Sequence, residues 1–343
     1  MSAYRKIAKV LSSTLVNLVL VGALVSVSTE CKSEITNLEY VQQCQAAGVD
    51  IPGTLSCQAG TEITLTASTC NDEGEILSQE VLTPRGFRSD PKQCDHPSLV
   101  QRLSPIAGCI PGDRFVWKKL SNGTLCAMVC RRTMLLGALD EFTDISLICH
   151  QPKNGATCFF NSNVDVIFGK GYRGDQILPP GHPKQTVWKE PEGLNESRCI
   201  DCHDKSPFLI TPNLKQLKGT IYKDYQPGGK YWVVGDKKPF AAAVWKNRYV
   251  LDEPNACTTC HDIGSGIHGG CGHLRDVATG RSSYLSPTQC GFEKGFMPPK
   301  HFGNVGEFEK DIQRIEQCCR DFNDEGLLKP EGLCRWKKLE SFL

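Results

Sequence analysis

The stretch FVWKKLSNGTLCAMVCRR, Phe115–Arg132, decides the fold expected for the first half of the chain. Two runs rich in apolar residues, Phe115–Leu120 and Gly123–Arg132, flank the turn sequence Ser121-Asn122-Gly123. Short runs of β-forming residues separated by Asn and Gly are typical of antiparallel sheets. The stretch therefore predicts two neighbouring strands of such a sheet.

Further short runs of this kind lie on both sides of the stretch: Thr61–Thr69, Ile145–His150 and Thr157–Asn161. A short helix is expected before them at Ile35–Ala47, where apolar residues recur on one stripe and Gly48 ends the pattern. Together these signals predict that residues 29–190 form an antiparallel β domain.

The texture of the sequence changes after a stretch rich in Pro and Gly, Leu178–Gly193, which is interpreted as a linker. Beyond it, residues 305–322 carry the clearest helical pattern of the chain, with apolar residues on one face. Asn304 and Glu307 are placed as the cap residue and its partner. We therefore expect a second domain at residues 191–343.

The overall charge excludes one class of function. The 343 residues contain 39 Lys and Arg against 38 Asp and Glu, so the formal net charge is +1. Proteins that bind nucleic acid normally carry a clustered basic excess. With 40% apolar and 22% charged residues, the composition is that of a globular protein, and nucleic acid is not expected as a partner.

The N-terminus has the features of a secretory signal. Residues 1–9 carry three basic and no acidic side chains, and Val10–Val27 is mostly apolar. A small residue, Ser28, stands where cleavage is expected, so residues 1–28 are predicted to be a signal peptide. An uncleaved membrane anchor and a lipoprotein form with lipid at Cys31 are the alternatives.

Export would place the protein in the periplasm or outside the cell. Loss of the three basic residues of the signal would turn the net charge from +1 to about −2, which leaves no basic excess for strong membrane binding. The compartment would also be oxidising, so most of the 19 cysteines are expected in disulfides.

Some disulfide pairs can be suggested from the sequence. Ten cysteines between residues 31 and 158 are expected to crosslink the β domain. Cys271 is expected to pair with Cys290, and Cys334 with Cys318 or Cys319. Adjacent side chains on a helix point in different directions, so Cys318 and Cys319 should have different partners.

Two short motifs carry the chemistry. CIDCH at Cys199–His203 and CTTCH at Cys257–His261 both match C-x-x-C-H, the attachment signature of c-type haem. In this motif two thiols form thioethers to the haem, and the His binds the iron. A zinc ribbon would place its two Cys pairs closer together, and a redox dithiol needs neither the His nor a second copy. The cysteines assigned to haem attachment are Cys199, Cys202, Cys257 and Cys260, and the assigned iron ligands are His203 and His261.

The second motif resembles the class I cytochromes c. The segment Phe296–Pro299 lies beyond His261 and before the predicted helix at residues 305–322. In those proteins the Met of such a segment is the sixth iron ligand, and a terminal helix packs on the motif helix. The resemblance thus implies Met297 as a ligand and a mainly α fold for residues 191–343.

As a whole, the chain resembles exported diheme cytochrome c domain proteins of Gram-negative bacteria. This resemblance implies two covalently bound c-type haems, electron transfer, and redox partner proteins. Since the propionates of two haems would add negative charge, a partner with a basic docking face is expected. The implied fold is mixed, with an N-terminal disulfide-rich antiparallel β domain and a C-terminal mainly α diheme domain.

The distal ligand of the first haem stays open. No Met lies between His203 and the second motif, so His150, His268 and His273 are the candidates. An empty sixth position is the alternative, and it would favour a peroxidase-like haem enzyme. A third hypothesis treats the β domain as a surface recognition module that carries a redox domain.

Overall fold

The computed structural model describes just over half of the chain. The described residues are 35–71, 75–83, 94–95, 109–132, 140–162, 171–191, 193–194, 199, 203, 205–211, 213–235, 249–259, 263, 309–321, 329 and 331–338. The predicted signal peptide, residues 1–28, lies outside them. Among these residues, we find no helix whose length and apolar character would let it cross a membrane.

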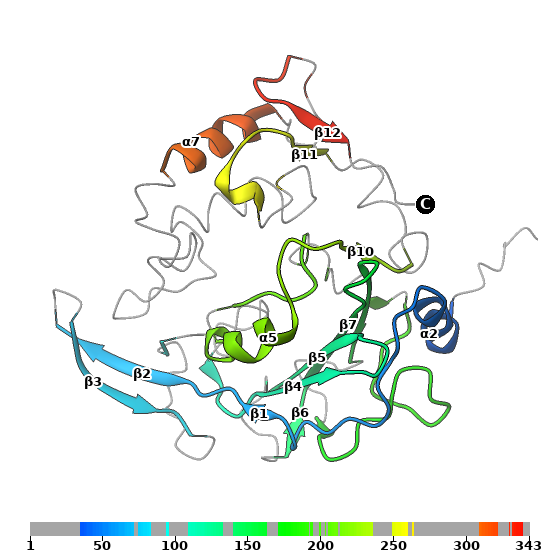
Figure 1. Cartoon of the computed structure of the whole chain (residues 1–343). Coiled ribbons are helices and arrows are strands. Elements are labelled where there is room, and N and C mark those ends of the chain that lie inside the picture. Colours follow the sequence, from blue (N-terminus) through cyan, green and yellow to red (C-terminus); the bar gives the residue numbers. More distant parts are fainter. Residues whose placement is uncertain are drawn as a thin grey trace, which may run out of the picture. The chain divides into compact units, whose positions relative to one another are not determined.

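A six-stranded sheet forms the centre of the described structure, with the strand order β1-β4-β5-β7-β8-β10 (Figure 1). All neighbouring strands are antiparallel except β10, which runs parallel to β8. The strands predicted from the sequence between residues 115 and 161 are present. The bounds are β1 Thr61–Glu62, β4 Arg114–Lys119, β5 Leu125–Arg131, β7 Asp144–His150, β8 Ala156–Asn161 and β10 Trp232–Val233.

Three two-stranded sheets accompany the central one: β2 with β3, β6 with β9, and β11 with β12. The predicted strand Thr61–Thr69 is divided between β1 and β2. The bounds are β2 Thr66–Cys70, β3 Ile76–Val81, β6 Glu141–Phe142, β9 Tyr172–Arg173, β11 Tyr249–Leu251 and β12 Trp336–Lys338.

The helix predicted at Ile35–Ala47 is present as α2, Asn37–Ala46. The Thr36 hydroxyl accepts a hydrogen bond from the backbone N–H of Glu39, and the Glu39 carboxylate accepts one from the backbone N–H of Thr36. This capping box satisfies N–H groups that have no partner inside the helix. Gly48 follows the helix with φ +85°, a conformation that favours glycine.

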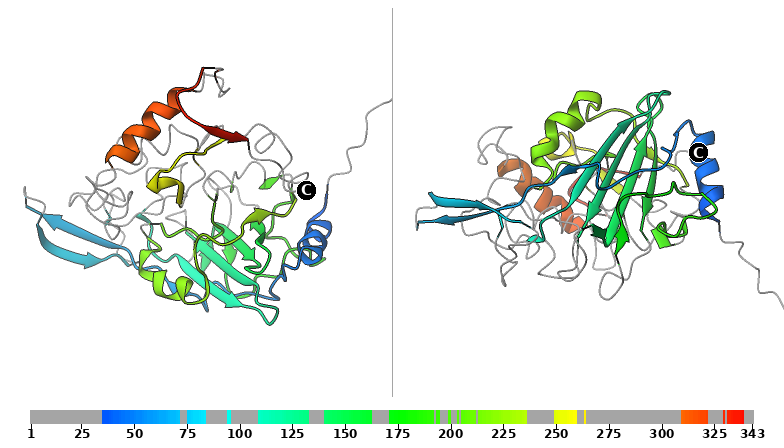
Figure 2. Two further views of the ribbon diagram at one scale, coloured as in Figure 1. Left: turned by 45° about the horizontal axis from the view of Figure 1, so that its top comes forward. Right: turned by 90° about the horizontal axis from the view of Figure 1, so that it is seen from below.

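The sheet has two buried faces. On one face the ladder sets Cys126 opposite Cys149, and Cys149 opposite Cys158. These residues belong to the larger core cluster, which includes residues of α2. On the other face lies a second cluster, to which α5, Lys218–Asp224, contributes Ile221. Figure 2 lets the reader follow the sheet with α2 and α5 beside it.

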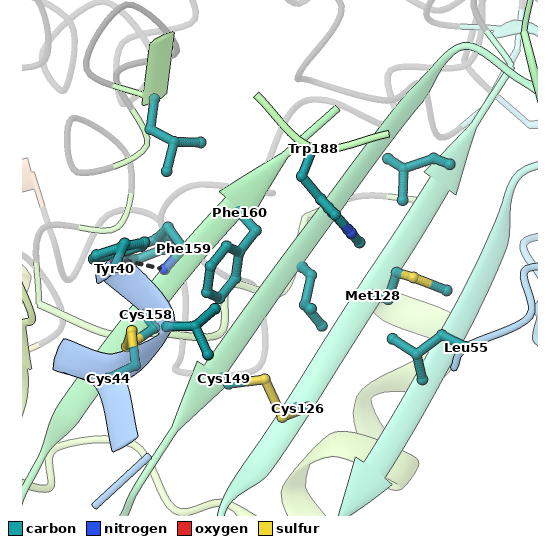
Figure 3. Packing of buried hydrophobic residues seen from close by; sticks show 14 of the residues in the cluster. Tyr40, Cys44, Leu55, Cys126, Met128, Cys149, Cys158, Phe159, Phe160 and Trp188 are labelled. Carbon is teal, nitrogen blue, oxygen red and sulfur yellow. Dashed lines mark hydrogen bonds between the residues drawn. A yellow bond between two sulfur atoms is a disulfide. The ribbon is translucent and has the colours of Figure 1, made fainter. Parts of the chain in front are cut away.

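A single hydroxyl connects α2 to the edge of the sheet. Tyr40 is fully buried, and its hydroxyl donates to the carbonyl of Val234 at 3.3 Å. The same oxygen accepts the backbone N–H of Phe159 at 3.3 Å, which Figure 3 marks with a dashed line. Val234 follows β10 and Phe159 lies in β8, so the hydroxyl joins the two chain segments where their ladder ends.

The region interpreted as a linker packs against the larger core. Val187 and Trp188 are buried, and the ring of Trp188 lies 6.2 Å from the ring of Phe160 (Figure 3). The backbone N–H of Lys189 donates to the carbonyl of Asn161. Proline and glycine give this stretch an irregular backbone. The stretch nevertheless packs against the core and is not a solvent-exposed linker.

Disulfides crosslink the described structure, as expected from the cysteine content. Cys334 pairs with Cys318, and Cys319 is disulfide-bonded as well, so the prediction of different partners for the two adjacent cysteines is confirmed. Cys271 and Cys290 lie outside the described residues. The bridges with both cysteines described are Cys44–Cys158, Cys57–Cys130, Cys94–Cys109, Cys126–Cys149 and Cys318–Cys334.

The prediction of a mainly α C-terminal domain is wrong. Among the described residues the α-helices are only seven to ten residues long, and strands dominate. After residue 190, β10 and α5 join the central sheet and its second core. Helices stay short there because Pro and Gly recur; α5, for example, ends just before residues 227–229, Pro-Gly-Gly.

The last described segments form a small cluster of their own. The predicted helix at 305–322 is present as α7, Glu309–Cys318, and continues as the 3₁₀ turn η6, Cys319–Asp321. Its buried residues Ile315 and Cys318 contact Leu251 of β11 and Ile263. The proposed cap residues Asn304 and Glu307 lie outside the described residues.

Candidate functional site

The first C-x-x-C-H motif makes a helical turn. The backbone N–H of His203 donates to the carbonyl of Cys199 at 3.0 Å, which is the spacing of one turn of α-helix. Such a turn brings the Cys199 and His203 side chains to the same side of the backbone, because residues four apart share a face. Cys202, the other cysteine of the motif, lies outside the described residues.

The imidazole of His203 has a defined orientation. Its Nδ1 atom lies 3.4 Å from the carbonyl oxygen of Ser206, and its ring centroid lies 5.4 Å from that of Phe159 in β8. The hydroxyl of Tyr231 donates to the main-chain carbonyl of His203 at 2.6 Å. The His is half-buried, so it is held by neighbours without being enclosed.

The motif lies beside Tyr40 and the larger core. Cys199 packs against this core as a partly buried residue. The pKa of Tyr40 is raised, first because burial penalises the phenolate and to a smaller extent because a thiolate at Cys199 would repel it. Contacts with α2, with β8 and with the residues next to β10 therefore hold the first motif against the central sheet.

The second motif begins in a 3₁₀ helix, η3, Ala256–Thr259. Asn255 caps it: its Oδ1 accepts the backbone N–H of Cys257 at 2.9 Å, and its carbonyl accepts the N–H and the hydroxyl of Thr258. The Nδ2 of Asn255 donates to the carbonyl of Asp311 in α7 at 3.0 Å. The cap residue thus ties the start of the motif to α7.

Charged residues hold the chain around the second motif in place. Glu253 forms an ion pair with Arg314 of α7 at 2.9 Å and also accepts the backbone N–H of Arg335. The hydrogen bond from Arg314 lowers the pKa of Glu253 below its usual value. Asp321 accepts the backbone N–H groups of Leu333 and Cys334. These contacts fix α7, β11 and β12 around the motif.

Glu253 also approaches Cys318 and Cys334 closely enough for the three to be considered as metal ligands. However, Cys318 and Cys334 are joined in a disulfide, and Glu253 is paired with Arg314. A disulfide sulfur is not a thiolate, so this group is not a metal site.

One hydrogen bond links the two motif segments. The ammonium of Lys205, two residues after His203, donates to the carbonyl of Thr258, which lies between the two cysteines of the second motif. Residues more than 50 positions apart in the sequence therefore meet at this point.

His150, one candidate distal ligand, is a core residue. It is 1% exposed, and its Nδ1 lies 2.9 Å from the Thr157 hydroxyl. The rings of Phe208 and Tyr225 meet it edge to face, with centroids 6.0 and 5.7 Å away. Burial lowers the pKa of His150 to about 4, so the imidazole is neutral at pH 7, as a ligand must be. The hydrogen bond to Thr157 of β8 and the ring contacts give His150 a structural role in the core of the central sheet.

Several predicted site residues lie outside the described part of the chain. They are Cys202, Cys260, His261, His268, His273 and Met297. Of the predicted site residues that are described, Cys199 lies one helical turn before His203, and Cys257 lies in the segment tied to α7.

Sequence reasoning missed the residues that support His203. The Tyr231 hydroxyl contacts its carbonyl, and the Ser206 carbonyl contacts its imidazole. Tyr225 acts indirectly, through its contact with the Ser206 hydroxyl. Only Ser206 stands close to the motif in sequence, and a serine followed by proline carries no signal for this role. The two tyrosines are 28 and 22 positions beyond His203, so only the folded chain identifies them.

The residues present fit a covalently attached haem at the first motif. A His that binds a metal usually donates its second ring N–H to a carbonyl or carboxylate, which fixes the tautomer and turns the other nitrogen toward the metal. The Nδ1 of His203 beside the Ser206 carbonyl matches this arrangement, with Cys199 one turn earlier. The donor set of two thiols and one imidazole also suits a c-type haem.

Comparisons with protein-family models, curated proteins and solved structures found no match to this chain.

Proposed function

We propose that the chain is an exported electron carrier with two covalently bound c-type haems, one on Cys199 and Cys202 and one on Cys257 and Cys260. His203 would bind the first iron and His261 the second. Met297 is proposed as the distal ligand of the second haem.

One observation supports the proposal above the others. The Nδ1 atom of His203 lies 3.4 Å from the Ser206 carbonyl, one helical turn after Cys199. Donation from Nδ1–H favours the tautomer in which Nε2 carries the lone pair, which is the form that binds a metal. A His placed only for packing would not need this contact.

The bound haems would supply iron that alternates between the ferric and ferrous states. The protein would contribute the rest: Cys199 and Cys257 would help to fix the positions of the haems, and His203 would donate its lone pair to the first iron. Electron transfer needs no catalytic group beyond the haem that the motif residues would hold, so it is the function that these residues favour.

The five disulfides whose cysteines are both described support export, because disulfides persist in oxidising compartments. We propose the periplasm or the cell exterior as the location, reached through the signal peptide at residues 1–28. The near-neutral net charge and the haem propionates favour a redox partner with a basic docking face.

The test is haem content in the full chain, produced with a system that attaches haem to exported proteins. Haem staining after denaturing electrophoresis and haem quantitation should give two haems per chain. Cys199→Ser with Cys202→Ser should leave one, and so should the matching pair of substitutions at Cys257 and Cys260.

The matched control removes two cysteines that are not in a motif. Cys94→Ser with Cys109→Ser breaks a disulfide of the β domain and should keep both haems. A wild-type chain without a stained band would refute the proposal. Reduced protein should pass electrons to an oxidised acceptor with a basic face, and the rate should fall as salt concentration rises.

A further inference from the structure

Two tyrosines hold His203 at two different points. Tyr231 donates its hydroxyl to the main-chain carbonyl of His203 at 2.6 Å. The second contact reaches the imidazole, since its Nδ1 lies 3.4 Å from the carbonyl oxygen of Ser206. What fixes Ser206 therefore also fixes the ring of His203.

Ser206 is fixed by two hydrogen bonds of its hydroxyl. The hydroxyl donates to the carbonyl of Phe208 at 3.1 Å, and its oxygen lies 2.9 Å from the hydroxyl oxygen of Tyr225. Because the single hydrogen of the Ser206 hydroxyl is directed at Phe208, the Tyr225 hydroxyl is the donor in the second bond.

Tyr225 is itself anchored in the core. It follows α5 directly and is 4% exposed. Its ring meets the rings of Phe208 and His150 edge to face, with centroids 5.1 and 5.7 Å away. His150 is bound in turn to Thr157 of β8. A continuous set of contacts thus runs from the central sheet through Tyr225 and Ser206 to the imidazole of His203.

We propose that Tyr225 is a positioning residue for His203, which holds the Ser206 carbonyl against Nδ1–H and thereby lowers the reduction potential of the first haem. This inference rests on the proposed function, in which His203 binds the first iron. A hydrogen bond accepted from Nδ1–H makes the imidazole a stronger electron donor, and a stronger donor stabilises ferric iron relative to ferrous iron.

The test compares two substitutions that each remove one hydroxyl from the surroundings of the same His. Tyr225→Phe keeps the ring and removes the donor to Ser206, so the reduction potential of the first haem should shift upward. Tyr231→Phe removes a hydrogen bond to the main chain of His203, which does not involve the ring, so the potential should shift less than in Tyr225→Phe.

A second measurement reads the hydrogen bond itself. In the reduced protein, the Nδ1–H proton of His203 can be followed by NMR, and its exchange with water should be faster in Tyr225→Phe than in wild type or Tyr231→Phe. Ser206→Ala removes the hydroxyl that accepts the hydrogen bond from Tyr225. It should therefore raise the reduction potential of the first haem and speed the exchange of the Nδ1–H proton, as Tyr225→Phe does. The second haem, whose potential should not change, serves as an internal reference.

The outcomes separate the two proposals. If wild type carries no haem on Cys199 and Cys202, the proposed function itself fails. If both haems are present but Tyr225→Phe leaves the first potential and the exchange rate unchanged, the positioning role is refuted. Equal shifts in Tyr225→Phe and Tyr231→Phe would also refute it, because they would indicate general loosening.

Discussion

Replacing Tyr40 with Phe tests how much one buried hydroxyl contributes to the fold. The substitution keeps the ring, which packs 5.3 Å from the ring of Phe160, and removes only the oxygen. The backbone N–H of Phe159 and the carbonyl of Val234 then lose the partner that they share. Both groups are buried between α2 and the sheet, so water cannot easily replace it.

The expected loss follows from these two groups. An unsatisfied buried backbone group costs about 1 to 3 kcal/mol, and both bonds, at 3.3 Å, lie at the long end of the usual range. We therefore take the lower value for each and expect Tyr40→Phe to lower the free energy of unfolding by about 2 kcal/mol.

The assay is unfolding in urea, followed by circular dichroism, with the disulfides intact. The matched control is Tyr172→Phe, because the Tyr172 hydroxyl donates to the carbonyl of Thr186 at an exposed site where water can take its place. The control should lose less than about 0.5 kcal/mol. If Tyr40→Phe lost no more than this control, the bridging role of the Tyr40 hydroxyl would be refuted.

Two further predictions concern pH and crosslinks. Because burial lowers the pKa of His150 from 6.5 to about 4, the unfolded chain binds a proton there that the folded chain does not. The free energy of unfolding should thus fall by roughly 3 kcal/mol as the pH drops from 6.5 to 4. In His150→Gln, measured by urea unfolding, this part of the pH dependence should be absent. The disulfides Cys44–Cys158 and Cys94–Cys109 close loops of 114 and 15 residues. Removing the first pair should therefore cost about 2 kcal/mol more in thermal or urea unfolding than removing the second, and an equal cost would contradict the loop-entropy argument.

The strands of the first half could be predicted because their signals are local. Between β4 and β5, the sequence Ser121-Asn122-Gly123 marks a turn, and apolar runs mark the strands on either side. The strand β10 could not be predicted in this way, since Trp232 and Val233 form no run. Its pairing with β8 depends on residues more than 70 positions earlier in the chain.

The error in the C-terminal half has a similar origin. The mainly α fold came from a resemblance at motif residues, and two motifs of five residues do not determine the elements between them. The segment with β11 instead pairs with Trp336–Lys338, residues that carry no periodic apolar pattern. The helix α7 was predictable because its amphipathic pattern extends over several turns.

The candidate site was predictable only in part, for the same physical reason. The motif at Cys199–His203 is visible because its residues are consecutive. The neighbours of His203 are selected by packing, and Tyr225 reaches it through Ser206 only after α5 lies on the sheet.

The strand register also bears on how the disulfides form in the correct combination. Cys149 stands directly opposite both Cys126 and Cys158, so it has two thiols within bridging range once the sheet is made. Cys158 is taken by Cys44 of α2, which leaves Cys126 for Cys149. Docking of α2 thus selects between two disulfide isomers during oxidative folding. A chain oxidised before α2 docks would be open to the Cys149–Cys158 isomer, and thiol–disulfide exchange would be needed to recover the native pairing.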